Sequence, residues 1–140
     1  TRALAWQTGA KMVWLAGPAE EGELPYIEAL AAAQGHLLAS GRPLSQVAAI
    51  LAQCRLFIGG DSGLTHLAAA LGEARVLALF GPTDPRVWAP LGKKVRVLTG
   101  PCDSAPCTRG REIDCQDNRC LRDLSPRVVL QAAVELWEGG

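Results

Sequence analysis

The chain has 140 residues, and 14 lysines and arginines balance 14 aspartates and glutamates, so it carries no net charge at neutral pH. Without a net positive charge, the chain has no general electrostatic attraction for nucleic acid, and no long run of basic residues marks a membrane-binding tail. No apolar stretch approaches the roughly 20 residues that span a bilayer, and no signal peptide opens the sequence. These features predict a soluble cytoplasmic protein, long enough for one domain with a sizeable core but not for two.

The first third of the chain alternates helix-like and strand-like segments. Residues 2–7 indicate a short helix that ends at Gly9, and residues 11–16 indicate a strand whose near-continuous apolar run suits a covered parallel sheet. A helix over 24–34 and a strand over 36–38 follow. Because Thr1 is not a methionine and leads directly into a helix, we expect the chain to be a fragment of a longer protein.

A third helix is expected to follow Pro43, with Ser45 at its N-cap and with Val47, Ile50 and Leu51 on its buried face. The stretch from Leu56 to Pro85 comes next, and it organises the rest of the chain. Its order of apolar run, alanine-rich helix former and apolar run predicts a strand–helix–strand crossover between parallel neighbours.

Polar residues of this crossover collect at its two turns, residues 59–63 and 81–85, each of which follows the carboxyl end of a strand. In an open parallel sheet, ligands bind at that edge. The first turn also opens a helix, whose unpaired N–H groups and positive dipole end attract phosphate. The pattern indicates a nucleotide-type site, although the same residues also serve ordinary turn and cap chemistry.

The last part of the chain is predicted to begin with one helical turn over 85–88, capped by Asp84, and to continue with a strand over 95–98. An irregular loop over 100–120 holds four cysteines, and a closing amphipathic helix, introduced by Ser125-Pro126, is expected over residues 124–137. The resulting order predicts an α/β protein with a Rossmann-like, doubly wound parallel sheet of about five strands.

Two blocks carry a family resemblance: GDSGLTHLAAALG over residues 60–72 and LFGPTDP over residues 79–85. At this spacing the sequence resembles glycosyltransferase family 9, the heptosyltransferases of lipopolysaccharide core synthesis. The likeness extends back to the strand that ends at Ala16 and its acidic run, and forward to CLRDLS over residues 120–125. It therefore covers nearly all of the chain.

The resemblance implies a fragment of a two-domain GT-B enzyme. Residues 1–140 match the C-terminal domain, which binds the nucleotide-sugar donor, whereas the absent N-terminal domain binds the acceptor and supplies the catalytic base. A basic residue that meets the donor phosphates in the family lies upstream of Thr1 and has no counterpart here. The implied reaction transfers heptose from ADP-heptose to the lipopolysaccharide inner core, with inversion and without a metal ion or cofactor. The fragment alone is expected to be inactive, and at most peripherally associated with the inner face of the membrane.

The resemblance also implies the roles of individual residues. Asp61 would accept hydrogen bonds from the transferred sugar, the backbone from Ser62 to Thr65 would hold the diphosphate, and His66 would meet a phosphate oxygen as a neutral donor. Glu20 would hold the ribose hydroxyls, and residues 42–44 would line the adenine pocket. The full expected donor-binding set is Glu20, Arg42, Leu44, Asp61, Ser62, Gly63, Leu64, Thr65, His66, Thr83 and Asp84.

Other functions remain open on the sequence alone. Four cysteines, Cys102, Cys107, Cys115 and Cys120, could make a zinc-binding interaction module, although only their outer spacings fit zinc ligand pairs. A plain nucleotide-binding module, a nucleotide-sugar epimerase or another GT-B enzyme would keep the same fold.

Overall fold

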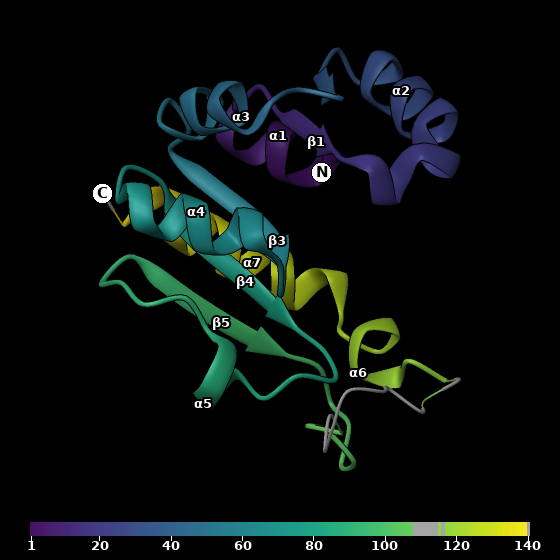
Figure 1. Cartoon of the computed structure of the whole chain (residues 1–140), viewed down its shortest axis with the longest axis vertical. Helices are drawn as coiled ribbons and strands as arrows, with labels where there is room; N and C mark the ends of the chain where they lie inside the picture. Colours follow the sequence, from purple (N-terminus) through teal and green to yellow (C-terminus); the bar gives the residue numbers. More distant parts are fainter. Residues whose placement is uncertain (108–114, 116, 140) are drawn as a thin grey trace. The chain divides into compact units, whose positions relative to one another are not determined.

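The computed structural model describes residues 1–107, 115 and 117–139, and the chain divides into two compact units, Thr1–Ile50 and Leu51–Gly140. Each unit is built from parallel strands and helices (Figure 1). This agrees with the α/β fold expected from the sequence. Among the described residues, no helix is long and apolar enough to cross a membrane.

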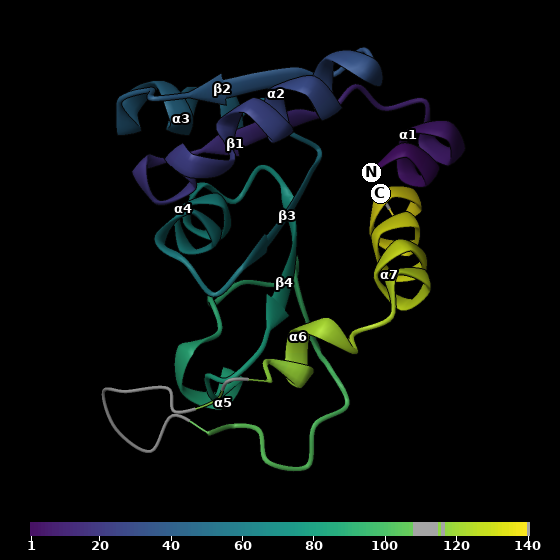
Figure 2. The same cartoon turned by 90° about the vertical axis from the view of Figure 1, so that its right-hand side faces the viewer.

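The first unit contains a two-stranded parallel sheet of β1 (Val13–Ala16) and β2 (Leu37–Ser40), in which Val13 lies opposite Leu37. Helix α2 packs against both strands and buries Ala31 (Figure 2). The N–H of Gly9 closes the first helix on Ala5, as predicted. The helices of this unit are α1 (Arg2–Thr8), the 3-10 helix η1 (Pro18–Glu23), α2 (Leu24–Ala33) and α3 (Leu44–Leu51).

Helix α3 begins two residues earlier than an N-cap at Ser45 implies. The carbonyl of Pro43 accepts from the N–H groups of Gln46 and Val47, so Pro43 occupies the N-cap position and Ser45 lies inside the first turn. The prediction of Ser45 as N-cap is therefore wrong. Val47 and Leu51 are buried as expected.

The second unit contains a three-stranded parallel sheet in the order β3-β4-β5. Leu56 pairs with Arg75 and Val76 pairs with Val95, so the carboxyl ends of the three strands lie at one edge. The elements are β3 (Leu56–Gly60), α4 (Gly63–Leu71), β4 (Arg75–Phe80), α5 (Pro85–Trp88), β5 (Val95–Thr99), α6 (Arg119–Arg122) and α7 (Pro126–Glu138).

Strand β4 is the centre of this unit. Val76, Leu77, Ala78 and Phe80 are completely buried, because α4 and α7 cover opposite faces of the sheet (Figures 1 and 2). Burying a side chain of this size stabilises the fold by about 1.5–3 kcal/mol. The near-continuous apolar sequence of β4 is the pattern of a strand that is covered on both sides.

The number and direction of the strands agree with the predicted doubly wound fold. All five strands are parallel to their neighbours, but hydrogen bonds within the described part divide them into two sheets rather than a single five-stranded one.

Helix α7 starts after Ser125, two residues later than the predicted start at Leu124, and contacts the strands near its C-terminal end. The guanidinium of Arg55, which precedes β3, donates to the carbonyl of Trp137 at 2.6 Å and stands 4.8 Å from the centre of the indole ring. Arg96 on β5 forms an ion pair with Glu135 at 2.5 Å. These contacts fix the last helix against the strands.

Helix α6 is absent from the sequence-based prediction, which placed a loop up to residue 120. It packs beside the carboxyl end of β4 (Figure 1). Its approach to the chain after β5 is so close that a Cβ on Gly100 would lie 1.8 Å from the carbonyl oxygen of Cys120. Only glycine leaves that space free.

Candidate functional site

The turn between β3 and α4 presents polar groups at the carboxyl edge of the second unit's sheet. Gly60 ends β3, Asp61 and Ser62 form the turn, and α4 starts at Gly63 (Figure 1). Asp61, Ser62 and Gly63 are all exposed. The structure thus places these three predicted residues at the edge where parallel sheets bind ligands.

The first turn of α4 has two N–H groups to offer a ligand. Those of Thr65 and His66 already donate to the carbonyl of Ser62, at 3.1 and 3.3 Å. Those of Gly63 and Leu64 have no hydrogen-bond acceptor within the described part of the chain. With the positive end of the helix dipole behind them, these two groups can hold an anion. The Thr65 N–H, which the resemblance includes among the phosphate contacts, is not available.

The hydroxyl groups of Ser62 and Thr65 form hydrogen bonds within the same turn. The Thr65 side chain, only 1% exposed, donates from Oγ1 to the carbonyl of Gly60 at 2.5 Å. Ser62 Oγ lies 3.2 Å from Thr65 Oγ1. Ser62 is the N-cap residue of α4, yet its hydroxyl makes no capping bond to the helix backbone. His66, by contrast, is exposed in the first turn of the helix, where it can meet a ligand.

The second turn, after β4, has a different composition. Asp84 Oδ1 accepts from the N–H of Arg86 at 2.9 Å and so caps α5, while Oδ2 pairs with the Arg86 guanidinium at 2.7 Å. Hydrogen bonds from the Arg86 side chain hold the pKa of the Asp84 carboxyl below its usual range. The capping role agrees with the prediction from the sequence. Both carboxylate oxygens of Asp84 already accept hydrogen bonds from Arg86, so they are not free to bind a nucleotide-sugar donor. The Thr83 hydroxyl is buried and has no partner within the described residues.

The remaining expected donor contacts, Glu20, Arg42 and Leu44, belong to the first unit. Glu20 follows β1 in η1, and its Oε2 accepts from the N–H of Gly17 at 2.7 Å. This bond ties one carboxylate oxygen to the local turn and leaves the other without a protein donor in the described part of the chain. Arg42 and Leu44 are exposed at the start of α3.

The four cysteines, all of which lie among the described residues, form no group there that could hold a metal ion. Cys120 is buried, Cys102 and Cys107 are half-buried, and Cys115 is exposed. Burial, and then the charge of the Cys102 thiolate, raises the pKa of the Cys120 thiol, which disfavours the thiolate that a metal requires. Within residues 1–107, 115 and 117–139, no group of three or more histidine, cysteine or acidic residues could hold a metal ion. The proposed zinc ligands therefore do not assemble there.

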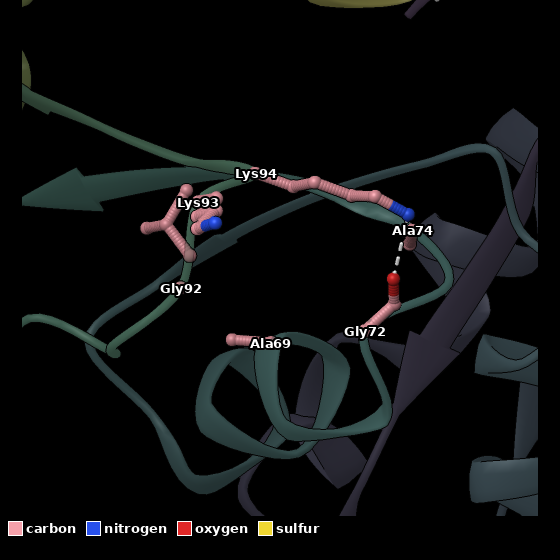
Figure 3. Close-up of a pocket in the computed structure, with 7 residues that line it drawn as sticks. Ala69, Gly72, Ala74, Gly92, Lys93 and Lys94 are labelled. Carbon is pink, nitrogen blue, oxygen red and sulfur yellow. Dashed lines mark hydrogen bonds between the residues drawn. The ribbon is translucent and has the colours of Figure 1, made fainter.

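A cavity of about 190 Å³ lies at the opposite end of α4, between Gly72 and the residues that lead into β5 (Figure 3). Lys94 Nζ donates to the carbonyl of Gly72 at 2.7 Å, so the lysine caps the negative end of the helix. No sequence prediction pointed to this cavity. Its position at the helix C-terminus separates it from the unpaired N–H groups of the β3–α4 turn.

The chain is similar in sequence to known glycosyltransferases. The family model of glycosyltransferase family 9 (heptosyltransferase) matches residues 2–116. Lipopolysaccharide heptosyltransferase 2 of Escherichia coli is 43% identical over 104 residues, which are 69% of this chain and 30% of that protein. Lipooligosaccharide heptosyltransferase 2 of Haemophilus ducreyi is 42% identical over 62 residues, 44% of this chain and 18% of that protein.

Solved structures agree in fold. A family 9 glycosyltransferase of Veillonella parvula superposes with a TM-score of 0.76 at 24% identity, over 99% of this chain and 40% of that one. ADP-heptose lipopolysaccharide heptosyltransferase II of Escherichia coli gives a TM-score of 0.71 at 26% identity, over 97% and 40%. A second Escherichia coli heptosyltransferase, solved with ADP, gives 0.71 at 26%, over 96% and 38%. This chain thus spans less than half the length of these relatives.

Proposed function

The chain belongs to glycosyltransferase family 9, and from that membership we propose that it binds the nucleotide-sugar donor of a heptosyltransferase. The proposed donor is ADP-heptose and the proposed acceptor is the lipopolysaccharide inner core. The names of the relatives support ADP-heptose as the donor and lipopolysaccharide as the acceptor, and the ADP in one similar structure supports the nucleotide. We further propose that residues 1–140 act as one nucleotide-sugar-binding domain, the C-terminal part of a GT-B enzyme whose other domain binds the acceptor.

The observation that carries this proposal is the open N-terminus of α4. Among the described residues, the N–H groups of Gly63 and Leu64 have no acceptor at the carboxyl edge of the sheet, where the exposed carboxylate of Asp61 also lies. A diphosphate placed there gains two hydrogen bonds and the helix dipole. As the sugar leaves, negative charge grows on the diphosphate, and the same groups stabilise that charge in the transition state.

Asp61 has a separate proposed role. A carboxylate is a poor partner for phosphate, but it accepts hydrogen bonds from sugar hydroxyls well. Substitution Asp61→Ala in the full-length enzyme should therefore lower heptose transfer far more than ADP affinity. Asp103→Ala, which removes a carboxylate outside the turn, serves as the control. Equal transfer rates in the Asp61 variant and the unchanged enzyme would contradict the sugar role.

For the first unit, we propose that Glu20 accepts hydrogen bonds from the ribose. Its second carboxylate oxygen has no protein donor in the described part of the chain. Hydrogen bonds to a charged group contribute about 1.5–3 kcal/mol, so Glu20→Gln should weaken ADP and ADP-heptose binding alike, roughly tenfold or more. Glu21→Gln, on the same short helix, is the matched control. If the control loses affinity and Glu20→Gln does not, Glu21 holds the ribose.

The proposed reaction is an inverting displacement that needs no metal ion. An acceptor hydroxyl attacks the anomeric carbon and the nucleoside diphosphate leaves. We assign the catalytic base to the acceptor domain and none to this chain. Residues 1–140 should accordingly fold alone and bind ADP weakly, but transfer no sugar. A transfer assay with and without the separately expressed acceptor domain, together with calorimetric titration of ADP, tests this. Turnover by the isolated chain would mean that the base lies here.

A further inference from the structure

We propose that Thr65 is a positioning residue for the donor diphosphate: its buried hydroxyl sets the conformation of the β3–α4 turn, so that the Gly63 and Leu64 N–H groups face a bound anion. This inference rests on the proposed donor function and deepens it. Thr65 itself touches no ligand in this arrangement, because its side chain is 1% exposed and its N–H already donates to Ser62.

The hydroxyl protons of the turn can be assigned one by one. A threonine hydroxyl has a single proton, and that of Thr65 is donated to the carbonyl of Gly60 at 2.5 Å. In the 3.2 Å contact between Ser62 Oγ and Thr65 Oγ1, Ser62 must therefore be the donor. The two hydroxyls form a chain that runs from Ser62 through Thr65 to the end of β3.

This chain has a consequence for ligand contacts. The proton of Ser62 is used inside the turn, so the Ser62 side chain cannot donate to a phosphate without breaking its bond to Thr65. Apart from the exposed imidazole of His66, the main-chain N–H groups of Ser62, Gly63 and Leu64 are then the donors that remain for an anion at this helix end within the described residues. Their direction depends on the path of the chain from Gly60 to Ser62, which the Thr65 hydroxyl holds at both ends.

Gly59 shows how little room the Thr65 side chain has. A Cβ built on Gly59 would lie 2.9 Å from Thr65 Oγ1 and 2.7 Å from a ring carbon of Phe57. The last part of β3 is therefore packed directly against the hydroxyl. Only glycine at position 59 leaves room for the Thr65 side chain. Gly59 before the turn and Thr65 after it therefore favour the same conformation of the turn.

The test compares variants that differ in the hydroxyl alone. Thr65→Val keeps the shape of the side chain but removes both hydrogen bonds, whereas Thr65→Ser keeps the hydroxyl. Thr8→Val is the matched control, because Thr8 also donates to a main-chain carbonyl, that of Leu4 at 2.7 Å, but lies in α1. Calorimetric titration of ADP and steady-state transfer kinetics are measured on the full-length enzyme, and circular dichroism checks the fold.

We expect Thr65→Val to weaken ADP binding and to lower kcat, each roughly tenfold or more, because small misplacements of catalytic groups carry large penalties. Thr65→Ser should restore both to within about threefold of the unchanged enzyme, and Thr8→Val should change neither. A role in stability alone would leave ADP affinity and kcat unchanged in the folded Thr65→Val protein. That result would overturn the inference.

Ser62→Ala decides the matter if Thr65→Val does not fold. Ser62→Ala removes only the longer of the two Thr65 contacts, at 3.2 Å, and keeps the 2.5 Å bond from Thr65 to Gly60, so ADP affinity should stay within about threefold of the unchanged enzyme. A tenfold or greater loss would mean that the Ser62 hydroxyl, and not the bond from Thr65 to Gly60, governs anion binding, and this would overturn the inference. Failure of the unchanged enzyme to bind ADP would refute the proposed donor function itself and the inference with it. Normal ADP binding that persists in Thr65→Val would refute the inference only.

Discussion

Replacement of Gly100 by alanine offers a sharp test of the packing around the carboxyl edge of the second unit. The new Cβ would lie 1.8 Å from the carbonyl oxygen of Cys120, 2.8 Å from its carbonyl carbon and 3.3 Å from Cβ of Leu124. The two closest atoms belong to the main chain of α6, so no rotamer change can relieve the contact. Helix α6 must instead move away by roughly 1 Å or more.

Overpacking of this kind costs about 1–3 kcal/mol of unfolding free energy. For a chain of this size, 1 kcal/mol corresponds to about 3–5 °C in Tm, so Gly100→Ala should lower Tm by about 3–15 °C. Gly22→Ala is the matched control, because a Cβ there meets no atom within 4 Å and its backbone is not left-handed. The control should change Tm little. Urea and thermal unfolding of both variants in the same protein measure the difference, and equal midpoints would refute the packing described here.

Three further predictions concern other contacts. Arg55→Ala should lower the free energy of unfolding, measured in urea, by about 1–2 kcal/mol, because a hydrogen bond and a cation–π contact to Trp137 on α7 are both lost. Arg55→Lys should restore only part of this free energy. In timed alkylation read by mass spectrometry, exposed Cys115 should react before buried Cys120, whose raised pKa lowers its thiolate fraction; the reverse order would contradict the burial. Hydrogen bonds from the two α6 arginines lower the pKa of the Asp123 carboxyl, so this group stabilises the fold above its unfolded pKa and loses that effect as pH falls through the lower folded pKa. Asp123→Asn should therefore make the free energy of unfolding depend less on pH below about pH 4. An unchanged pH dependence in that range would contradict this.

Much of the second unit could be predicted from the sequence because its signals are local. The strand–helix–strand order around residues 56–80 follows from apolar runs and helix formers, and Asp84 and Ser125 occupy the N-cap positions expected from the prolines that follow them. Helix α6 could not be predicted. It has only four residues, and its N-cap, Asn118, adopts a left-handed conformation with no side-chain cap, so neither periodicity nor capping chemistry marks it.

The candidate site, too, could be predicted only in part from the sequence. Glycine, aspartate and a helix start indicate where an anion could bind, and the structure assembles these groups as expected. Hydrogen-bond partners, however, are a property of three-dimensional proximity. The sequence does not reveal that the Thr65 N–H is already used, that its hydroxyl reaches Gly60, or that Asp84 is engaged by Arg86. Short polar motifs therefore indicate where the candidate site lies, whereas the N–H groups that are available in it are known only from the folded geometry.

The burial of β4 has a consequence for amide hydrogen exchange. This strand is bonded to β3 on one side and β5 on the other, and its residues 76–78 have no exposed surface, so its amides should open only with the whole unit. The Gly63 and Leu64 amides, which have no acceptor in the part of the chain that the structure describes, should exchange within the fastest class despite their helical position. A ligand that binds them would turn two of the fastest amides into protected ones without altering the slow core. Exchange at these two positions therefore reports occupancy of the turn directly, separately from the stability of the fold.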